Sequence, residues 1–261
     1  MGDVGLLLVG VVLLVNGLVT LGVVPPRSAA LLNVFVGTAQ VLLPTIILVQ
    51  HGGDAAVVNA TWPSYLFGFT YLYYGLGIFL DLEPQGLGWF SSFVAAIAAY
   101  EAVVTVGHDP VFAVIWLTWA VMWSLFFLLM ALDRSGLTRF AGWFLVLLGV
   151  PTCTVSALFL LEGRWSSAPA AGWAALAGLL LLTALSWGLL ARVLTAANGG
   201  EQSELRKVLG ADRKTPGSIV IHVAATAIAF RQPVVSCVLY AVVAAMWFIP
   251  DRRIEQRLGS R

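Results

Sequence analysis

Aromatic side chains recur along two segments of the chain at the spacing of a single helix face. Phe67, Tyr71 and Tyr74 are separated by intervals of 4 and 3 residues. The second set has intervals of 4, 3 and 4 and consists of Phe112, Trp116, Trp119 and Trp123. Residues at such intervals share one face of an α-helix, so each set predicts a stripe of rings.

Two stripes that face each other would leave a flat slot between their ring faces. Such a slot suits a small, planar, neutral and polar molecule, because the rings contact its plane while Tyr hydroxyl and Trp N–H groups meet its edge. Neither stripe carries a charge that could replace the hydration shell of an ion. The alternative is that the rings pack a core, as aromatic residues in membrane proteins commonly do. Spacing alone leaves both interpretations open.

The elements that must position these rings are membrane-spanning helices. The chain has 261 residues, of which 60% are hydrophobic and 10% charged, and its mean hydropathy is +0.93. Soluble domains are about 25% charged. The run 4–24 is long enough to cross a bilayer, and it lacks the basic start and cleavage site of a signal peptide. The composition predicts an all-α, polytopic integral membrane protein.

Breaks at proline, glycine and charged residues divide the chain into apolar runs. Those before a long polar segment are 4–24, 30–50, 62–80, 88–107, 111–132, 139–161 and 169–191. Two more, 217–230 and 233–249, flank Arg231-Gln232-Pro233 and form either one long helix or a hairpin. The hairpin places 12 of the 14 Lys and Arg residues on one side. Because cytoplasmic loops collect these residues, we expect a hairpin, an N-terminus outside and a C-terminus in the cytoplasm.

Several functional classes are disfavoured by the sequence. Cys153 and Cys237 lie inside apolar runs, which argues against a disulfide and a metal cluster. The net charge of +1 argues against a nucleic-acid surface. The sequence shows no carboxylate pair, nucleophile–base set, zinc-ligand spacing or phosphate-binding loop, and no soluble domain that could house an active site. We expect a protein that is not an enzyme and has no catalytic residues, cofactor or metal.

Five segments carry a resemblance to a known family. In chain order they read "LLVGVVLLVNG", "LLNVFVGTAQ", "FGFTYLYYG", "GLGWFSSFVA" and "IWLTWAVMWSLFFLL". Together they resemble the first five helices of the AmiS/UreI family of urea and short-chain amide channels, and the resemblance covers about 1–165. It implies a bundle of six transmembrane helices, a hexameric ring of protomers, and conduction through the middle of each protomer.

The resemblance also implies which side chains line the pore. One constriction would be formed by Val9, Leu13, Phe67, Met122 and Trp123. The other would be formed by Leu6, Tyr71, Phe112, Trp116 and Trp119. Because these sets contain most of the two stripes, the resemblance favours a pore over a packed core.

The sixth helix departs from the family pattern of a Glu-Gly pair followed by Thr and a later Pro. This chain reads "LLGVPTCTVSALF", in which Leu148 stands in place of the Glu, Thr152 is kept and Ser156 replaces the Pro. The missing carboxylate, and outer loops that are short and hold only His51 and His108, argue against gating by acid.

Polar residues inside the predicted spans need an explanation, because they are costly in a bilayer. Glu101 has three open interpretations: its carboxylate reaches the water, pairs across a protomer boundary, or lines a vestibule. Asn16 and Asn33 are uncharged, and we expect them to hydrogen-bond between helices.

The C-terminal third carries a second, weaker resemblance. The segment "IHVAATAIAFRQPVVSCVLYAVVAAMWFIPDRRIEQ" resembles the last hairpin of bacterial relatives of lysosomal potassium channels, but the helix that supplies their ion filter has no counterpart. Helix packing, oligomer assembly and partner contact are the roles that remain. The predicted organisation is a six-helix urea/amide-channel-like domain at 1–165, an additional helix at 166–191, a cytoplasmic linker at 192–216, a transmembrane hairpin at 217–250 and a basic cytoplasmic tail at 251–261.

The expected function is passive conduction of urea or short-chain aliphatic amides through an aromatic-lined pore in the plasma (inner) membrane. Its partners would be the amide, the lipid bilayer and further copies of the chain, with no nucleic acid. Two alternatives belong to other classes: an ion or proton channel, and a non-conducting membrane scaffold or sensor. A closed aromatic slot would favour the scaffold.

Overall fold

A computed structural model of the protein describes residues 2–172, 174–176, 178, 214–229, 235, 239 and 242–243. Within these ranges the chain forms helices and connecting turns, and no strand. Contacts within the chain divide it into two units, Met1–Ser167 and Ala168–Arg261. The first unit contains both aromatic stripes.

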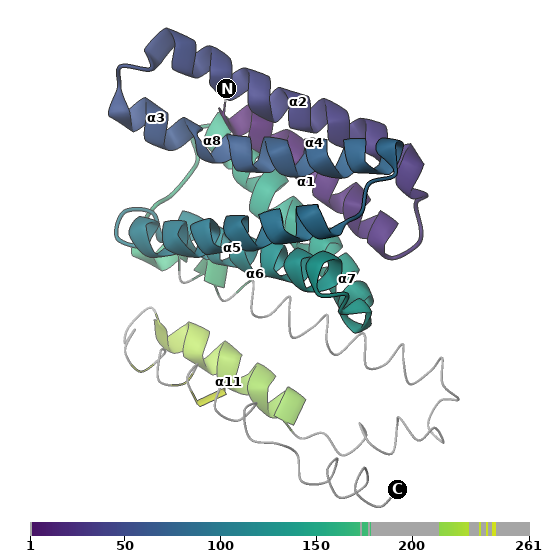
Figure 1. Cartoon of the computed structure of the whole chain (residues 1–261). Coiled ribbons are helices and arrows are strands. Elements are labelled where there is room, and N and C mark those ends of the chain that lie inside the picture. The colour runs from purple at the N-terminus through teal and green to yellow at the C-terminus, as the bar shows by residue number, and fades with distance from the viewer. Residues whose placement is uncertain are drawn as a thin grey trace, which may run out of the picture. The chain divides into compact units, whose positions relative to one another are not determined.

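The first unit contains six consecutive helical segments, which we call crossings by analogy with membrane spans (Figure 1). The first four are α1 (Gly2–Thr20), α2 (Pro26–His51), α4 (Pro63–Leu80) and α5 (Gln85–Thr105), with the short α3 (Ala55–Thr61) between α2 and α4. The fifth is α6 (Pro110–Phe126), which continues as a π-helix over Phe127–Ala131. The sixth consists of a short 3₁₀ turn at Ser135–Leu137, then α7 (Thr138–Gly149), a π-helix over Val150–Val155 and α8 (Ser156–Leu161).

Five of these segments are long and apolar enough to cross a membrane: Gly2–Thr20, Pro26–His51, Gln85–Thr105, Pro110–Ala131 and Ser135–Leu161. Helix α4 is shorter, at 18 residues, and it carries four tyrosines. It lies along α2 and also contacts α5. The predicted all-α, multi-pass membrane fold is therefore confirmed.

The ends of the helices follow from local sequence. Pro26, Pro63 and Pro110 lie in the first turns of α2, α4 and α6, where a missing N–H leaves no helical hydrogen bond unmade. The side chain of Asp109 accepts a hydrogen bond from the backbone N–H of Phe112 and so caps α6. Helix α4 ends at Leu80 and is capped by Asp81, whose φ of 54° is left-handed and whose N–H donates to the carbonyl of Gly77.

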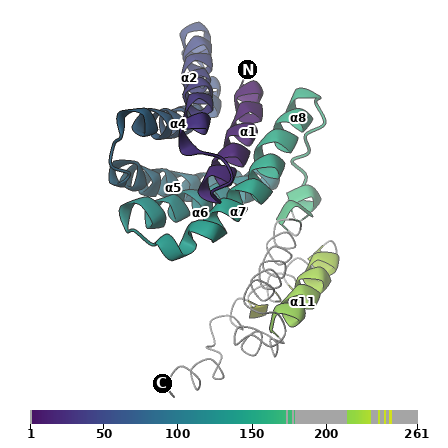
Figure 2. The ribbon, with the colours of Figure 1, turned by 90° about the vertical axis from the view of Figure 1, so that its right-hand side faces the viewer.

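The helices associate in three pairs: α2 with α4, α5 with α6, and α1 with the sixth crossing (Figures 1 and 2). The first pair is close because two glycines meet. A Cβ atom added to Gly37 of α2 would lie 2.7 Å from the backbone nitrogen of Leu72 and 2.9 Å from the carbonyl oxygen of Gly68, both on α4. Small residues that let backbones approach in this way are a common basis of helix association in membranes.

A reciprocal pair of amides joins α1 to α2. Asn16 Nδ2 donates to Asn33 Oδ1, and Asn33 Nδ2 donates to Asn16 Oδ1, each at 2.8 Å. Asn33 Nδ2 also donates to the carbonyl of Ala29 at 3.0 Å. Both side chains are buried. The interhelical hydrogen bond expected from the sequence is present, and it is made twice.

Loss of this pair is expected to destabilise the bundle in a way that a double-mutant cycle resolves. Asn16→Ala and Asn33→Ala should each lower the stability of the detergent-solubilised protein, because each leaves the other amide buried without its partner. The double variant should be less destabilised than the sum of the two, with a coupling of about 0.6–1.7 kcal/mol. Equilibrium unfolding in SDS measures this coupling free energy. Strictly additive effects of the two substitutions would contradict a stabilising interaction between the two amides.

The second unit is described in part. Helix α11 (Lys214–Ala229) has 16 residues and falls on the predicted run 217–230, and it includes His222. At 1.5 Å per residue it is about 24 Å long, shorter than a hydrocarbon core of about 30 Å. The hairpin tip Arg231–Pro233, most of 233–249, the linker up to 213 and the tail 251–261 lie outside the described residues. The predicted division of the chain into five segments stays a prediction.

Candidate functional site

The two aromatic stripes meet in one cluster at the middle of the bundle, between α4 and α6. We call Phe67, Tyr71, Trp116, Trp119 and Trp123 the ring cluster. The ring of Phe67 lies 4.9 Å from that of Trp119 and 4.8 Å from that of Trp123, centroid to centroid. Trp116 and Trp119 lie 5.0 Å apart. The sequence therefore predicted correctly that the stripes face each other.

The rings meet edge to face, so they do not form the expected flat slot. The planes of Phe67 and Trp119 are inclined by 81°, those of Phe67 and Trp123 by 65°, and those of Trp116 and Trp119 by 85°. Every ring of the cluster is between 1% and 6% exposed. Inclined contacts place the positive edge of one ring on the negative face of the next, and they fill the space that parallel faces would leave open. The structure is closed at this level.

All ten side chains implied as pore-lining lie in or against one hydrophobic core. Helix α1 contributes Val9 and Leu13, and α6 adds Met122, each of them buried. Leu6 and Phe112 are partly buried and pack on the same core. Phe67, assigned to one constriction, contacts Trp116 and Trp119, assigned to the other, as well as Trp123. The separation into two constrictions, and the pore-lining role itself, stay predictions.

The retained threonine of the sixth crossing anchors a ring of the cluster. Trp119 Nε1 donates to Thr152 Oγ1 at 3.2 Å, and the Thr152 hydroxyl donates to the carbonyl of Leu148 at 2.6 Å. Leu148, which stands in place of the family's glutamate, is itself buried. The hydrogen bond fixes the orientation of the Trp119 indole without a charged group.

Two polar atoms of the ring cluster are buried and have no hydrogen-bond partner among the residues that the structure describes: the Tyr71 hydroxyl and Trp123 Nε1. An unpaired buried donor costs about 1–3 kcal/mol, so native proteins keep few of them. Their presence beside a predicted path for a polar solute is consistent with groups that the solute would pair.

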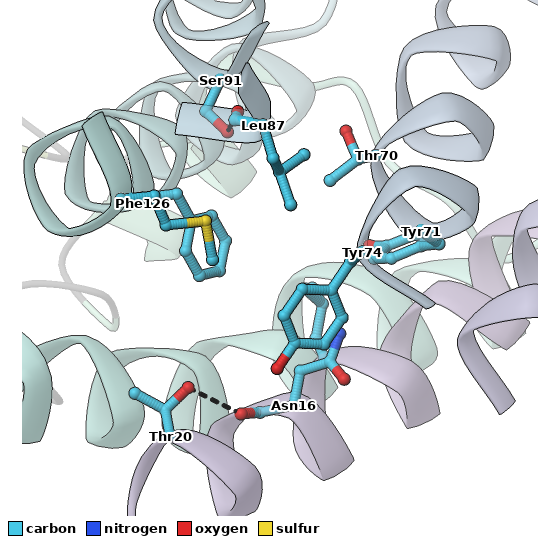
Figure 3. Close-up of a pocket in the computed structure, with 10 residues that line it drawn as sticks. Asn16, Thr20, Thr70, Tyr71, Tyr74, Leu87, Ser91 and Phe126 are labelled. Atoms are coloured by element: carbon cyan, nitrogen blue, oxygen red, sulfur yellow. Dashed lines mark hydrogen bonds between the residues drawn. The ribbon is translucent and has the colours of Figure 1, made fainter. Parts of the chain in front are cut away.

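A cavity of about 40 Å³ lies beside Tyr71, between α1, α4, α5 and the end of α6 (Figure 3). Its polar wall is made by Asn16, Thr20, Thr70, Tyr71, Tyr74 and Ser91. Its apolar wall is made by Leu13, Leu87, Phe126 and Met130. The pore-lining prediction had included Leu13 and Tyr71. The other eight were missed, although Tyr74 belongs to the first stripe and Leu87 and Ser91 share a helix face at a spacing of 4.

A contact between distant parts of the chain covers the opposite end of the ring stripe. Trp165, which follows α8, donates from Nε1 to Asp109 Oδ2 at 2.6 Å. Its ring lies 5.1 Å from that of Phe112, the first ring of the second stripe. The carboxylate that caps α6 therefore also holds an indole over Phe112.

Glu101, for which lining a vestibule was one of three open interpretations, does not line the cavity. It lies on α5 ten residues beyond Ser91, which is about 15 Å along a helix. No hydrogen bond or ion pair of its carboxylate is seen among the described residues, and its role stays a prediction. Within the same residues, no three His, Cys, Asp or Glu side chains come together as metal ligands.

Comparison with known proteins places this architecture in a family. The sequence model of the AmiS/UreI family of transporters matches residues 1–164. The putative transporter protein AmiS2 of Rhodococcus erythropolis is 53% identical over 190 residues, which cover 71% of this chain and 91% of that protein. A putative amidate substrates transporter protein of Mycolicibacterium smegmatis is 46% identical over 171 residues, covering 65% of this chain and 80% of its own length.

A solved structure agrees with the sequence relatives. The urea channel of Helicobacter pylori, determined by cryo-electron microscopy in a closed state, superposes with a TM-score of 0.58 at 28% sequence identity. The match covers 64% of this chain and all of the channel chain. The fold of the first unit is thus shared with that channel.

A potassium channel is also among the similar proteins. A potassium channel of a Chryseobacterium species is 33% identical over 79 residues, which cover 30% of this chain and 41% of that protein. The chain spans less than half of that channel, so the match carries no statement about activity. The match over 164 residues and the relatives above decide the classification: the chain belongs to the AmiS/UreI family of transporters.

Proposed function

We propose that the protein is a passive channel for urea or short-chain aliphatic amides, with a path through each six-helix bundle. The observation that carries the proposal is the meeting of both aromatic stripes beside a cavity that Tyr71 helps to line. Support comes from relatives described as an amidate substrates transporter and as a urea channel. Nothing in this arrangement calls for an enzymatic step, a cofactor or a metal.

Passage through the ring cluster would depend on rotation of its rings. The described structure is closed there, so a solute passes only when the edge-to-face contacts of Phe67 open. A planar amide can then replace a ring contact with one of its own faces, while its edge meets the Tyr71 hydroxyl and Trp123 Nε1. An ion gains no charged group in the cluster to replace its hydration shell, and is excluded.

A second candidate function is a membrane scaffold or sensor that has kept the fold and does not conduct. The closed ring cluster is the observation that favours it. The matched Helicobacter pylori structure is itself that of a channel in a closed state, so closure is compatible with conduction in this fold. We therefore keep the channel as the proposed function.

The same proposal includes a setting for the channel. The charge distribution supports an outside N-terminus and a cytoplasmic C-terminus in the plasma (inner) membrane, since Lys and Arg gather on one side. The resemblance to hexameric family members supports a homo-oligomer. Large apolar side chains on the outer faces of α2 and α5, among them Phe35, Phe93 and Tyr100, supply surface for lipid or for neighbouring protomers.

Stopped-flow light scattering on proteoliposomes tests the proposal. Vesicles that hold the purified protein are challenged with urea, acetamide, glycerol and potassium salts between pH 5 and 8. We expect urea or acetamide to enter several times faster than into empty vesicles, without potassium flux, and Trp119→Ala and Trp123→Ala to change the rate. Amide entry no faster than in empty liposomes would reject conduction and favour the scaffold.

A further inference from the structure

We propose that Thr152 is the positioning residue of the ring cluster: its hydroxyl holds the Trp119 indole in the closed arrangement, and loss of that one hydrogen bond lets the cluster open more often. The inference rests on the proposed function and adds to it the contact that keeps the path closed. Thr152 is not among the side chains that the family resemblance implies as pore-lining. It belongs to the sixth crossing and acts on a solute only through Trp119.

Trp119 lies at the centre of the closed cluster. Its ring contacts that of Phe67 at 4.9 Å and that of Trp116 at 5.0 Å, with the planes inclined by 81° and 85°. Both contacts are edge to face, so a turn of the Trp119 indole about its side-chain bonds would break the two of them together. The group that fixes this indole therefore fixes the arrangement of the rings on both sides of it.

The Trp119 indole is fixed at its one polar atom. Its Nε1 donates to Thr152 Oγ1 at 3.2 Å. No hydrogen bond from the indole of Trp116 or Trp123 is seen among the described residues, and the Tyr71 hydroxyl has no partner among them either. Within that part of the chain, the bond to Thr152 is thus the polar contact that links the ring cluster to a neighbouring crossing.

The Thr152 oxygen is prepared to accept. Its proton goes to the carbonyl of Leu148 at 2.6 Å, which leaves its lone pairs for other donors. Cys153 Sγ lies 3.6 Å from the same oxygen, and with the Thr152 proton engaged the thiol is the donor of that contact. The hydroxyl therefore keeps partners on its own helix when the Trp119 indole turns away, so release leaves no unpaired group on the sixth crossing.

The backbone around Thr152 is held in place by α1. Thr152 lies in the π-helix Val150–Val155, a rare conformation that is frequent at functional sites. A Cβ atom added to Gly10 of α1 would lie 2.9 Å from the backbone nitrogen of Thr154, so the two segments touch closely and leave little room for a shift. The hydrogen bond itself is weak, because 3.2 Å is the long end of the range for N–H···O. A fixed acceptor and a weak bond suit a contact that breaks and re-forms.

Fluorine NMR on the full chain in lipid nanodiscs, with 5-fluorotryptophan in place of tryptophan, tests the positioning. Trp119→Phe identifies the Trp119 signal by its loss. Thr152→Val should move or broaden this signal, because the indole loses its acceptor, whereas Thr152→Ser should leave it unchanged, because serine keeps the hydroxyl. Thr118→Val is the matched control: Thr118 is 3% exposed and precedes Trp119, but its hydroxyl donates to the carbonyl of Val114 on its own helix.

Urea entry into proteoliposomes measures the consequence for the path. Thr152→Val should admit urea about fivefold faster than the wild type, since the closed arrangement loses one hydrogen bond. Thr152→Ser and Thr118→Val should admit urea at the wild-type rate. Thr152→Ala gives an independent reading against Thr152→Ser, because these two variants differ only in the hydroxyl oxygen.

The outcomes separate this proposal from the proposed function. A Trp119 signal that changes in Thr152→Val and Thr152→Ala but not in Thr152→Ser or Thr118→Val supports the positioning role, even if the vesicles show no conduction. A Trp119 signal that all of these variants leave unchanged, or that Thr118→Val changes equally, overturns it, even if the wild type conducts urea. A changed signal with urea entry at the wild-type rate, in a protein that conducts, overturns it as well.

Discussion

Phe67→Ala is expected to open the ring cluster to solutes that the wild type excludes. The Phe67 ring contacts Trp116, Trp119 and Trp123, so its removal leaves a gap that the surrounding rings fill only in part. Glycerol should then enter proteoliposomes about tenfold faster than through the wild type, which corresponds to a barrier lowered by about 1.4 kcal/mol. Stopped-flow light scattering measures the rate.

Phe69→Ala is the control for this experiment, because Phe69 is on the same helix but 49% exposed. It removes the same number of atoms outside the cluster and should leave glycerol entry unchanged. Elution of Phe67→Ala as a monodisperse species shows that the variant is folded. If the folded variant admits glycerol no faster than the control does, the ring cluster is not the barrier to permeation.

Two glycine substitutions are expected to change stability in opposite directions. Gly37→Ala places a methyl group within 3 Å of backbone atoms of α4, which cannot rotate away, so α2 and α4 must separate. We expect a loss of about 1–3 kcal/mol and a clearly lower melting temperature in detergent. Gly77→Ala introduces the same group on α4 where no atom lies within 4 Å. It should gain up to about 1 kcal/mol, because alanine favours the helix over glycine.

Thermal unfolding followed by intrinsic fluorescence measures both variants against the wild type. A Gly37→Ala protein that melts with or above Gly77→Ala would show that the close approach of α2 and α4 does not contribute to stability. The comparison also separates crowding at the contact from helix propensity, since the two substitutions are chemically identical.

The helices and their facing stripes were predictable because they depend on local periodicity. The apolar runs up to residue 161 required only the length of a bilayer crossing. The spacing of Phe67 and Tyr71 in one stripe, and of Trp116 and Trp119 in the other, required only the helical repeat. The interhelical hydrogen bonding of Asn16 and Asn33 followed from the cost of leaving an amide unpaired in a membrane, whereas their pairing with each other is shown only by the structure.

The angles between the rings and the composition of the cavity were not predictable in the same way. A spacing fixes which residues share a face, but the tilt of Phe67 against Trp119 depends on side-chain rotamers and on the depth at which α4 and α6 pack. The cavity draws Thr20, Leu87 and Met130 from three separate crossings. The bond between Asp109 and Trp165 joins residues 56 positions apart, and no local pattern indicates it.

The hydrogen bonds that the Thr20, Thr70 and Ser91 hydroxyls donate have a consequence for proton transfer along the polar wall. A proton hops along a row of hydroxyls only if each one passes its hydrogen forward and then turns to accept the next. These three hydroxyls donate to carbonyls of their own helices, at 2.7–2.8 Å, so turning any of them forward would first break that hydrogen bond. A wall whose hydroxyls are held in this way does not by itself form a proton relay.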